Sequence, residues 1–463
     1  MRELKKLLAE IPTSNPYMQE SDIADAKRSA VTVVADDRRP SETTLVDNVP
    51  LSPGAESTYS FSSRASTMNV IPDLEKNGGS PSRPFPAELA GVARTAREKR
   101  ARSAPTPLSR LREWMSFYRI FFTLVVSLNI AGTVLTLAHR WALGRRRVAT
   151  FALVNILSSL LARNEIFLRV LYTVLLFFFN RWPPRWFRNG IATFLLHVGG
   201  LHSGFATSGT LWLIAGTIEF FRQGPSLIHP VILAFSVVAC VVLLAVCASA
   251  YPTIRNNHHN IFENIHRLAG WTGLAILWIL ACLADSWSVS EHHFANSGLA
   301  SKPDIYLAIV VTICIVAPWM TLRRVPVKPE VLSSSVVLLR FQGGYRSGLF
   351  GRISRHPLKE NHAFGIASMS PSSGEHYMCV VGQGDFTRGL IADPPMHLWT
   401  RQFKFVGLPY MCNFYRSGLY VCTGSAIGVA LSIFLQRDPR SKWHLLWICR
   451  CVSFLNILVM ATS

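Results

Sequence analysis

The sequence has 463 residues, of which 49% are hydrophobic, and its mean hydropathy is positive at +0.26. This composition excludes an ordinary soluble enzyme and favours a membrane protein with soluble parts. The formal net charge of +20 at pH 7 raises the question of nucleic-acid binding, but the arginines cluster beside apolar segments, as at 145–147 and 323–324. Such clusters are typical of the cytosolic ends of membrane spans, so we expect anionic lipids as partners and no nucleic acid.

Residues 1–112 are rich in Ser, Pro, Asp and Arg and show no hydrophobic periodicity. No secretory signal peptide opens the chain, so we expect a disordered cytosolic tail whose basic end lies on the membrane. The nine cysteines of the chain form no CxxC pair and no disulfide-like framework. This cysteine usage indicates a reducing compartment and no zinc site.

Residues 113–325 are expected to form a transmembrane helical domain, because apolar stretches long enough to cross the bilayer recur there. The predicted spans lie near 117–138, 150–180, 191–221, 229–252, 266–284 and 303–322. The second stretch is interrupted by Arg163, Asn164 and Glu165, so it is either one kinked helix or a span followed by an interfacial piece. Counted once, it gives an all-α bundle of about six transmembrane helices, and loop charge places both termini in the cytosol. The loops do not distinguish the plasma membrane from an organelle.

Histidines gather where the fifth predicted span begins, in NNHHNIFENIHRLAGW at 256–271. His266 is the best candidate metal ligand there, and His197 or His202 on the third span is its candidate partner for holding a haem. One alternative is that these histidines only form hydrogen bonds where helices pack, with His258 and His259 at the membrane interface. Another is a proton or ion path through the bundle.

After residue 325 the sequence changes to short β-rich runs at 336–341, 363–368 and 377–382, which predict a small β-barrel over 326–410. The stretch GLYVCTGSAIGVALSIFLQ at 418–436 then predicts a buried parallel strand, a glycine turn and a helix. This is the context in which a backbone turn binds phosphate. The chain stops soon afterwards, so we expect 411–463 to be a truncated α/β nucleotide-binding segment.

The order of these features resembles the ferric reductase and NADPH oxidase superfamily. The stretches HNIFENIHRLAGW, HAFG, GDFT and VCTGSAIG are more similar to the fungal TmpA-like integral membrane flavoproteins, which are also found fused to adenylate-forming reductases. The resemblance covers roughly residues 115–447. It implies that 326–410 binds FAD and that 411–463 is part of an NAD(P)-binding domain.

Two sets of cofactor-binding residues follow from this resemblance. The set at the flavin is His362, Ala363, Phe364 and Gly365, together with Thr387. The set at the pyrophosphate of a nicotinamide nucleotide is Gly424, Ser425 and Gly428. No catalytic residue is predicted.

The sequence departs from the superfamily in two ways that bear on cofactors. Members with two stacked haems carry histidine pairs 13 or 14 residues apart, and no such pair occurs among the candidate histidines, so at most one haem b is expected. Ala426 and Val429 stand where the superfamily favours Gly and Pro, and 448–463 replaces the rest of the nucleotide domain. Both features argue against NAD(P)H binding by this chain alone.

The function expected from the sequence is that of an integral membrane flavoprotein oxidoreductase. If active, it would pass electrons from NAD(P)H through FAD toward a membrane-side acceptor whose identity is not implied. The alternative is a non-catalytic membrane signalling or scaffold protein that keeps the ferric-reductase-like fold. A third interpretation is a transporter that uses Arg163 and Glu165 as intramembrane polar groups.

Overall fold

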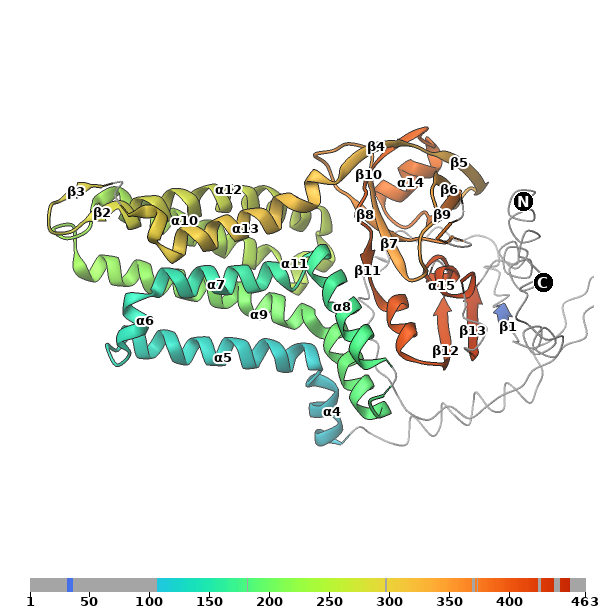
Figure 1. The fold of residues 1–463 in the computed structure, drawn as a ribbon, viewed down its shortest axis with the longest axis horizontal. Coiled ribbons are helices and arrows are strands. Elements are labelled where there is room, and N and C mark those ends of the chain that lie inside the picture. Colours follow the sequence, from blue (N-terminus) through green and yellow to red (C-terminus); the bar gives the residue numbers. More distant parts are fainter. Residues whose placement is uncertain are drawn as a thin grey trace, which may run out of the picture.

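The structure is a computed structural model, and it describes residues 31–35, 106–180, 182–295, 298–368, 371–372, 374–423, 426–436 and 442–449. Long helices form one end of the molecule and short strands form the other (Figure 1). Most of the predicted tail at 1–112, and the apolar ending after residue 449, lie outside the described residues.

The helical part contains ten α-helices among the described residues. They are α4 (Pro107–Trp114), α5 (Phe117–Leu137), α6 (Ala142–Arg146), α7 (Val148–Leu161), α8 (Glu165–Phe179), α9 (Arg185–Gln223), α10 (Pro230–Ser249), α11 (Pro252–Asn257), α12 (His259–Ser286) and α13 (Pro303–Met320). At the end far from the strands, β2 (Trp287–Ser288), β3 (His293–Phe294) and the short helix η1 (Leu299–Ser301) connect α12 to α13.

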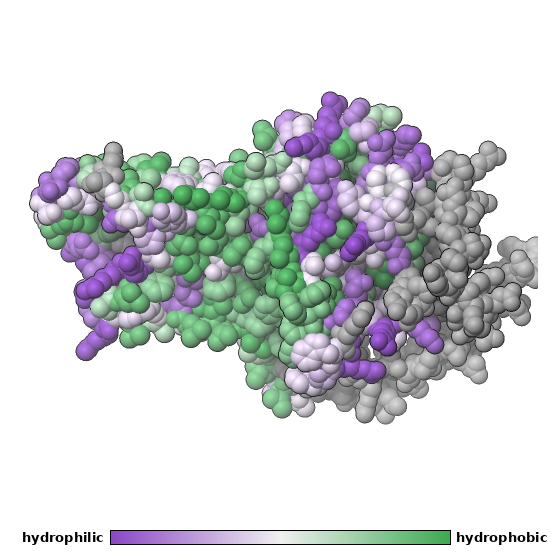
Figure 2. Space-filling model, in the orientation of Figure 1, coloured by the Kyte–Doolittle hydropathy of each residue, from purple (hydrophilic) through white to green (hydrophobic). Residues whose placement is uncertain are grey.

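Helices α5, α7, α9, α10, α12 and α13 run along the long axis of the helical part, and α8 lies across them beside the strands (Figure 1). Four of these helices, α5, α10, α12 and α13, are long and apolar enough to cross a membrane. Helix α7 is apolar but has only 14 residues, whereas α9 has 39. The surface of the helical part is largely hydrophobic (Figure 2), as expected for helices that face lipid.

The predicted second span is two helices, α7 and α8, and not one kinked helix. Asn164 separates them, because its side-chain oxygen accepts hydrogen bonds from the N–H groups of Ile166 and Phe167 at 3.0 and 2.9 Å. Such an N-cap begins a new helix in a new direction. The amide nitrogen of Asn164 also donates to the carbonyl of Cys314 on α13 at 2.8 Å, which fixes the break against the bundle.

The strands between residues 322 and 406 form two small sheets. The first has the order β11 (Phe405–Val406), β7 (Leu349–Ser354), β10 (His397–Arg401) and β4 (Leu322–Pro326), with β8 (His362–Gly365) also paired to β7. The second contains β5 (Lys328–Ser333), β6 (Val336–Gln342) and β9 (Glu375–Val381). Helix α14 (Asp385–Ala392) follows β9.

The prediction of a closed barrel is wrong for the described residues. A barrel requires its end strands to pair, whereas β4 and β11 end the first sheet and β5 and β9 end the second. A single bridge between Ala367 and Tyr377 joins the two sheets. The predicted strands near 336–341, 363–368 and 377–382 are themselves present as β6, β8 and β9.

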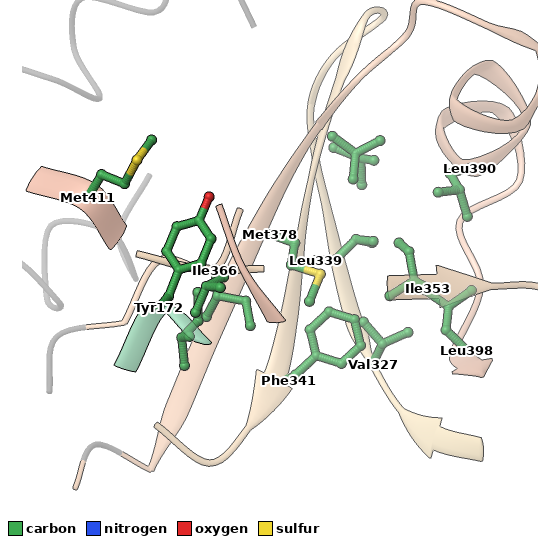
Figure 3. Packing of buried hydrophobic residues seen from close by; sticks show 14 of the residues in the cluster. Tyr172, Val327, Leu339, Phe341, Ile353, Ile366, Met378, Leu390, Leu398 and Met411 are labelled. Carbon is green, nitrogen blue, oxygen red and sulfur yellow. The ribbon is translucent and has the colours of Figure 1, made fainter. Parts of the chain in front are cut away.

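One hydrophobic core joins the two sheets to α8. Leu339, Ile353 and Met378 are fully buried between the sheets, and Tyr172 from α8 packs against the same cluster (Figure 3). Burying these side chains on one face of α8 attaches the strand-rich part to the end of the helical bundle.

The last described segment contains η2 (Leu408–Phe414), β12 (Ser417–Thr423), α15 (Ile427–Phe434) and β13 (Lys442–Cys449). Strand β12 pairs in parallel with β13, which also pairs in parallel with β1 (Val31–Ala35). The predicted parallel strand and helix at 418–436 are present as β12 and α15, whereas the expected burial of the strand is wrong, because only Cys422 of β12 is buried. Gly424 and Ser425, in the turn itself, lie outside the described residues.

Candidate functional site

Strand β8 and the start of α15 lie in direct contact. A Cβ atom added to Gly365, at the end of β8, would lie 3.0 Å from the carbonyl oxygen of Gly428 and 3.0 Å from the Cα atom of Val429. Both neighbours are backbone atoms, so only glycine fits at this position without a shift. The structure thus brings together the two stretches, HAFG and TGSAIG, that were predicted to bind cofactor.

His362, the first residue of β8, combines an aromatic contact with an unused polar atom. Its ring stacks on that of Phe386 with a centroid distance of 4.3 Å and an interplanar angle of 26°. Burial lowers the pKa of His362, and the carboxylates of Glu263 and Glu360 only partly oppose this effect. The ring is therefore neutral at pH 7, and its Nε2 atom is buried without a hydrogen-bond partner among the described residues.

The histidine-rich stretch at 256–271 lies where α11 ends and α12 begins. Glu263 belongs to the first turns of α12, close to His259, whose Nε2 atom is 3.4 Å from its carboxylate. The start of α12, which follows α11, lies at the end of the helical part that is nearest the strands (Figure 1).

Thr387 stabilises the helix in which it lies. Its hydroxyl oxygen accepts hydrogen bonds from the N–H groups of Gln383 and Gly384 at 2.9 and 3.0 Å, and donates to the carbonyl of Gly384 at 3.0 Å. A hydroxyl has one donor and two acceptor positions, so all are used here. Contact with a cofactor would require one of these bonds to break, and the cofactor role of Thr387 stays a prediction.

The remaining predicted cofactor residues have different surroundings. Ala363 is exposed on β8, opposite Arg352 of β7, whereas Phe364 packs against the core. Gly428 is buried, and a Cβ atom there would lie 3.3 Å from that of Cys379, so this glycine allows α15 to approach β9. Its assignment to a pyrophosphate, like the flavin assignments, also stays a prediction.

A buried ion-pair network holds α8 against the strands. Glu165 at the start of α8 accepts a hydrogen bond from Nε of Arg352 and another from Nη1 of Arg401, the latter at 3.1 Å. Burial lowers the pKa of Arg401, and the carboxylate of Glu165 opposes this effect. In the sequence, Glu165 is recognisable only as an interruption of an apolar stretch, and neither arginine is marked by any local pattern.

Two further buried polar residues lie between the sheets, and the sequence analysis did not identify them. Lys404 is 2% exposed, and its Nζ atom donates to the hydroxyl of Thr400 at 3.0 Å and to the carbonyl of Arg401 at 2.8 Å. Burial lowers the pKa of Lys404 to about 8. His376 is 3% exposed and donates from Nδ1 to the carbonyl of Gly343 at 2.6 Å, and burial lowers its pKa to about 4.

Of the candidate haem ligands, His202 and His197 lie on different sides of α9. His266 is on α12, whereas His202 of α9 lies against Ser159 of α7. The Nδ1 atom of His202 lies 3.0 Å from both the hydroxyl and the carbonyl oxygen of Ser159, while Nδ1 of His266 is buried without a partner among the described residues. His197 instead lies against Phe117 of α5, with a ring-centroid distance of 5.8 Å.

A multidentate metal site is not present in the described part of the chain. No group of three or more His, Cys, Asp or Glu side chains there is arranged to hold a metal ion. Any haem in the helical part would therefore rest on two histidine ligands, as a bis-histidine haem does.

Comparison with known proteins gives two curated relatives, both adenylate-forming reductases from Coprinopsis cinerea. Each is 32% identical to this chain, over 332 and 336 residues, which is 70% and 71% of the chain. The chain spans about a third of the length of these relatives, 32% in each case. No protein-family model matches the sequence.

Two solved structures share only a weak overall likeness. The flavohemoglobin from Malassezia yamatoensis, solved with bound FAD and heme, matches 73% of this chain and 80% of its own with a TM-score of 0.28 and 12% identity. Full-length CYP116B46 from Tepidiphilus thermophilus matches 81% of this chain and 69% of its own with a TM-score of 0.25 and 11% identity. At these scores neither structure supports an argument about this protein.

The similarity to the two reductases includes helices. A continuous match over about 70% of 463 residues leaves out no more than about 139 residues at either end, so it must contain residues from about 140 to about 324. Helices α7 to α13 lie in that range. The relatives therefore share the helical part with this chain, and the similarity is not confined to the strands.

This finding corrects the function expected from the sequence. The relatives are named as adenylate-forming reductases, and not as membrane flavoproteins that pass electrons from NAD(P)H through FAD to a membrane-side acceptor. The electron-transfer interpretation is therefore wrong. The alternative of a non-catalytic scaffold also gains no support, because both relatives are named as enzymes.

Proposed function

We propose that this chain is a membrane-embedded reductase module of the adenylate-forming reductase type, which reduces a carboxylic acid after its activation. The observation that carries the proposal is the 32% identity to two such reductases across a range that must include α7 to α13. In this chemistry a carboxylate first displaces pyrophosphate from a nucleoside triphosphate to form an acyl adenylate, and a thiol then displaces the nucleotide to give an acyl thioester. A hydride from a reduced nucleotide cofactor adds to the thioester carbon, the thiolate leaves with its electron pair and is protonated, and an aldehyde results.

The surface around His362 is the proposed cofactor site. Its buried Nε2 atom lacks a partner among the described residues, and a buried polar atom of this kind is costly unless a ligand or water binds it. The ring of Phe386 supplies an adjacent aromatic surface. We place the flavin or nicotinamide ring on the side of β8 that faces away from α15. It does not fit between β8 and α15, because Gly365 of β8 and Gly428 of α15 are already in contact.

The resemblance to TmpA-like proteins and to the ferric reductase superfamily supports a second cofactor. A haem b in the helical part would take His202 and His266 as its ligands, from α9 and α12. When bound, haem would supply one-electron chemistry. His197 is not part of this proposal, because it lies against α5.

The long apolar helices support a membrane surface as the location of the proposed reaction. We propose that α5, α10, α12 and α13 cross the bilayer together with α7 and α9, and that the strands lie on the cytosolic side. Helix α8 then lies along that surface, at the junction with the strands (Figure 1). A carboxylic acid with a long apolar chain suits this position, because its chain can remain in the bilayer while its carbonyl group reaches the strands.

The test uses the full chain purified in detergent, an acyl thioester as the activated substrate, and NADPH. We expect one aldehyde to form for each NADPH oxidised, and His362→Ala to slow the reaction by about 100-fold or more if His362 contacts the reacting groups. His397→Ala is the matched control, since His397 is exposed on β10. Absence of aldehyde from a folded protein that binds the added NADPH would overturn the proposed reaction.

A further inference from the structure

A pocket of about 530 Å³ lies where the end of α8, the start of α9 and the start of β12 meet. The residues that line it are Asn180, Arg185, Arg188, Tyr415, Arg416 and Ser417. It is separate from the proposed cofactor site at β8, and the proposed reaction uses none of these residues. Three arginines in one pocket form a strongly cationic site.

Within the described part of the chain, no carboxylate pairs with the arginines of this pocket. Among the described residues, no ion pair includes Arg185, Arg188 or Arg416. Arginines that converge without a carboxylate favour an anionic ligand, and the fork of the guanidinium group matches the geometry of phosphate oxygens.

Arg188 is held in place by backbone carbonyls, and one of its unused donors is buried. Its Nη1 atom donates to the carbonyl of Phe414 at 2.7 Å, and its guanidinium group lies over the ring of Tyr415 at 5.8 Å. Its Nε atom is buried without a partner among the described residues. The hydroxyl of Tyr415 in turn donates to the side chain of Asn189 at 2.9 Å, so the lining is ordered before a ligand binds.

An apolar face of α8 leads up to the pocket. Its exposed residues recur at helical spacing and are Phe167, Val170, Val174, Phe177 and Phe178. On the other side of the helix, Tyr172 and Leu176 are buried in the core that joins the sheets. A helix with one face in the protein core and an exposed apolar face is typical of a helix that lies in the membrane interface.

Two exposed tryptophans are close in sequence to the residues that line the pocket. Trp182, in the connection between α8 and α9, and Trp186, in the first turn of α9, are 73% and 74% exposed. Exposed tryptophans are characteristic of the boundary between lipid chains and headgroups. The hydrophobic surface of the helical part extends to the junction with the strands (Figure 2).

We propose that this pocket binds the phosphate of an anionic phospholipid headgroup. The arginines explain the phosphate, and the apolar face of α8 with the exposed tryptophans explains the lipid, because a soluble phosphate compound would not need them. The N-terminus of α9, which begins at Arg185, adds unsatisfied backbone N–H groups at the same place. The bound lipid would fix the junction between the helices and the strands at the membrane surface.

The experiment measures the melting temperature of the detergent-purified full chain with three probes: short-chain phosphatidic acid, short-chain phosphatidylcholine and inorganic phosphate. We expect phosphatidic acid alone to raise the melting temperature. In the double variant Arg185→Gln/Arg416→Gln its apparent affinity should fall about 25-fold, which is about fivefold per arginine. Arg188 is left unchanged because its hydrogen bonds also support the fold.

The matched control is Arg346→Gln/Lys359→Gln, which removes the same charge from exposed positions in the strand-rich part. It should retain the affinity for phosphatidic acid. An equal loss of affinity in this control would overturn the pocket and leave only general charge attraction. Equal stabilisation by inorganic phosphate would overturn the lipid assignment in favour of a soluble phosphate compound. Because aldehyde formation is not the readout, the result is independent of the proposed reaction.

Discussion

Replacing Glu165 by glutamine should loosen the attachment of the strands to the helical part. Glu165 lies at the start of α8, while Arg352 and Arg401 belong to the first sheet. Glutamine keeps the size of the side chain but removes the negative charge. Its NH₂ group also turns a donor toward one of the two guanidinium groups, so at least one hydrogen bond is lost.

The magnitude follows from the burial of the three partners. The side chains of Glu165 and Arg401 are only 9% and 13% exposed, whereas Arg352 is 32% exposed and is partly screened by solvent. Removing one partner of a buried pair usually costs about 3–5 kcal/mol. With one of the two arginines partly screened, we expect Glu165→Gln to lower the free energy of unfolding by about 3 kcal/mol. A cooperative unit of about 150–250 residues loses about 2–4 °C of melting temperature per kcal/mol, so the expected fall is about 6–12 °C.

The assay is thermal unfolding in detergent, combined with limited proteolysis between α13 and β5. Glu165→Gln should unfold at a lower temperature and be cut faster at this connection. Asp385→Asn is the control, because Asp385 and its partner Arg388 are 82% and 64% exposed, and such a surface pair contributes less than about 0.5 kcal/mol. Equal stability of the Glu165 and Asp385 variants would refute the reasoning.

Three further predictions concern residues between and around the sheets. Burial holds the pKa of Lys404 at about 8, below its ordinary value of 10.5, so between these pH values the unfolded chain binds more protons than the folded one. The free energy of unfolding of the wild type should therefore rise by about 3 kcal/mol from pH 8 to pH 10.5. Thermal melts should show this rise in the wild type and its loss in Lys404→Met. Burial lowers the pKa of His376 from 6.5 to about 4, so the unfolded chain takes up a proton at a higher pH than the folded chain does. The free energy of unfolding should therefore fall by about 3 kcal/mol from pH 6.5 to pH 4, and acid unfolding of His376→Gln should lack this loss. Gly365→Ala should lower the free energy of unfolding by about 1–3 kcal/mol, because the new Cβ atom meets the backbone of Gly428. Gly389→Ala in α14 should raise it by about 0.5–1 kcal/mol, because no atom lies within 4 Å of the new Cβ and alanine favours a helix. Chemical unfolding of the two variants measures both changes.

The local elements of this fold are predictable from the sequence, because their signals lie within each segment. The apolar stretches near 229–252 and 303–322 correspond to α10 and α13, and GLYVCTGSAIG corresponds to β12 and the start of α15. The separation of His197 from His202 also follows locally, because five residues turn a helix by about 140°. One of the two therefore faces α7 and the other faces α5.

The features that the sequence could not show depend on contacts between distant segments. Glu165 meets Arg352 and Arg401 from positions far along the chain, and no local pattern marks such a pair. Lysine is usually a surface residue, and Lys404 is buried only because two sheets enclose it. Strand pairing is equally non-local, which is why short strands that resemble those of a barrel form two open sheets.

The most direct test of the proposed function is product analysis with the full chain in a lipid bilayer. The protein would be supplied with NADPH and a long-chain acyl thioester, and the aldehyde would be trapped and identified by mass spectrometry. Our account predicts aldehyde in proportion to NADPH oxidised, with a strong loss in His362→Ala and none in His397→Ala. NADPH oxidation without aldehyde, or aldehyde formation that is the same in both variants, would contradict it.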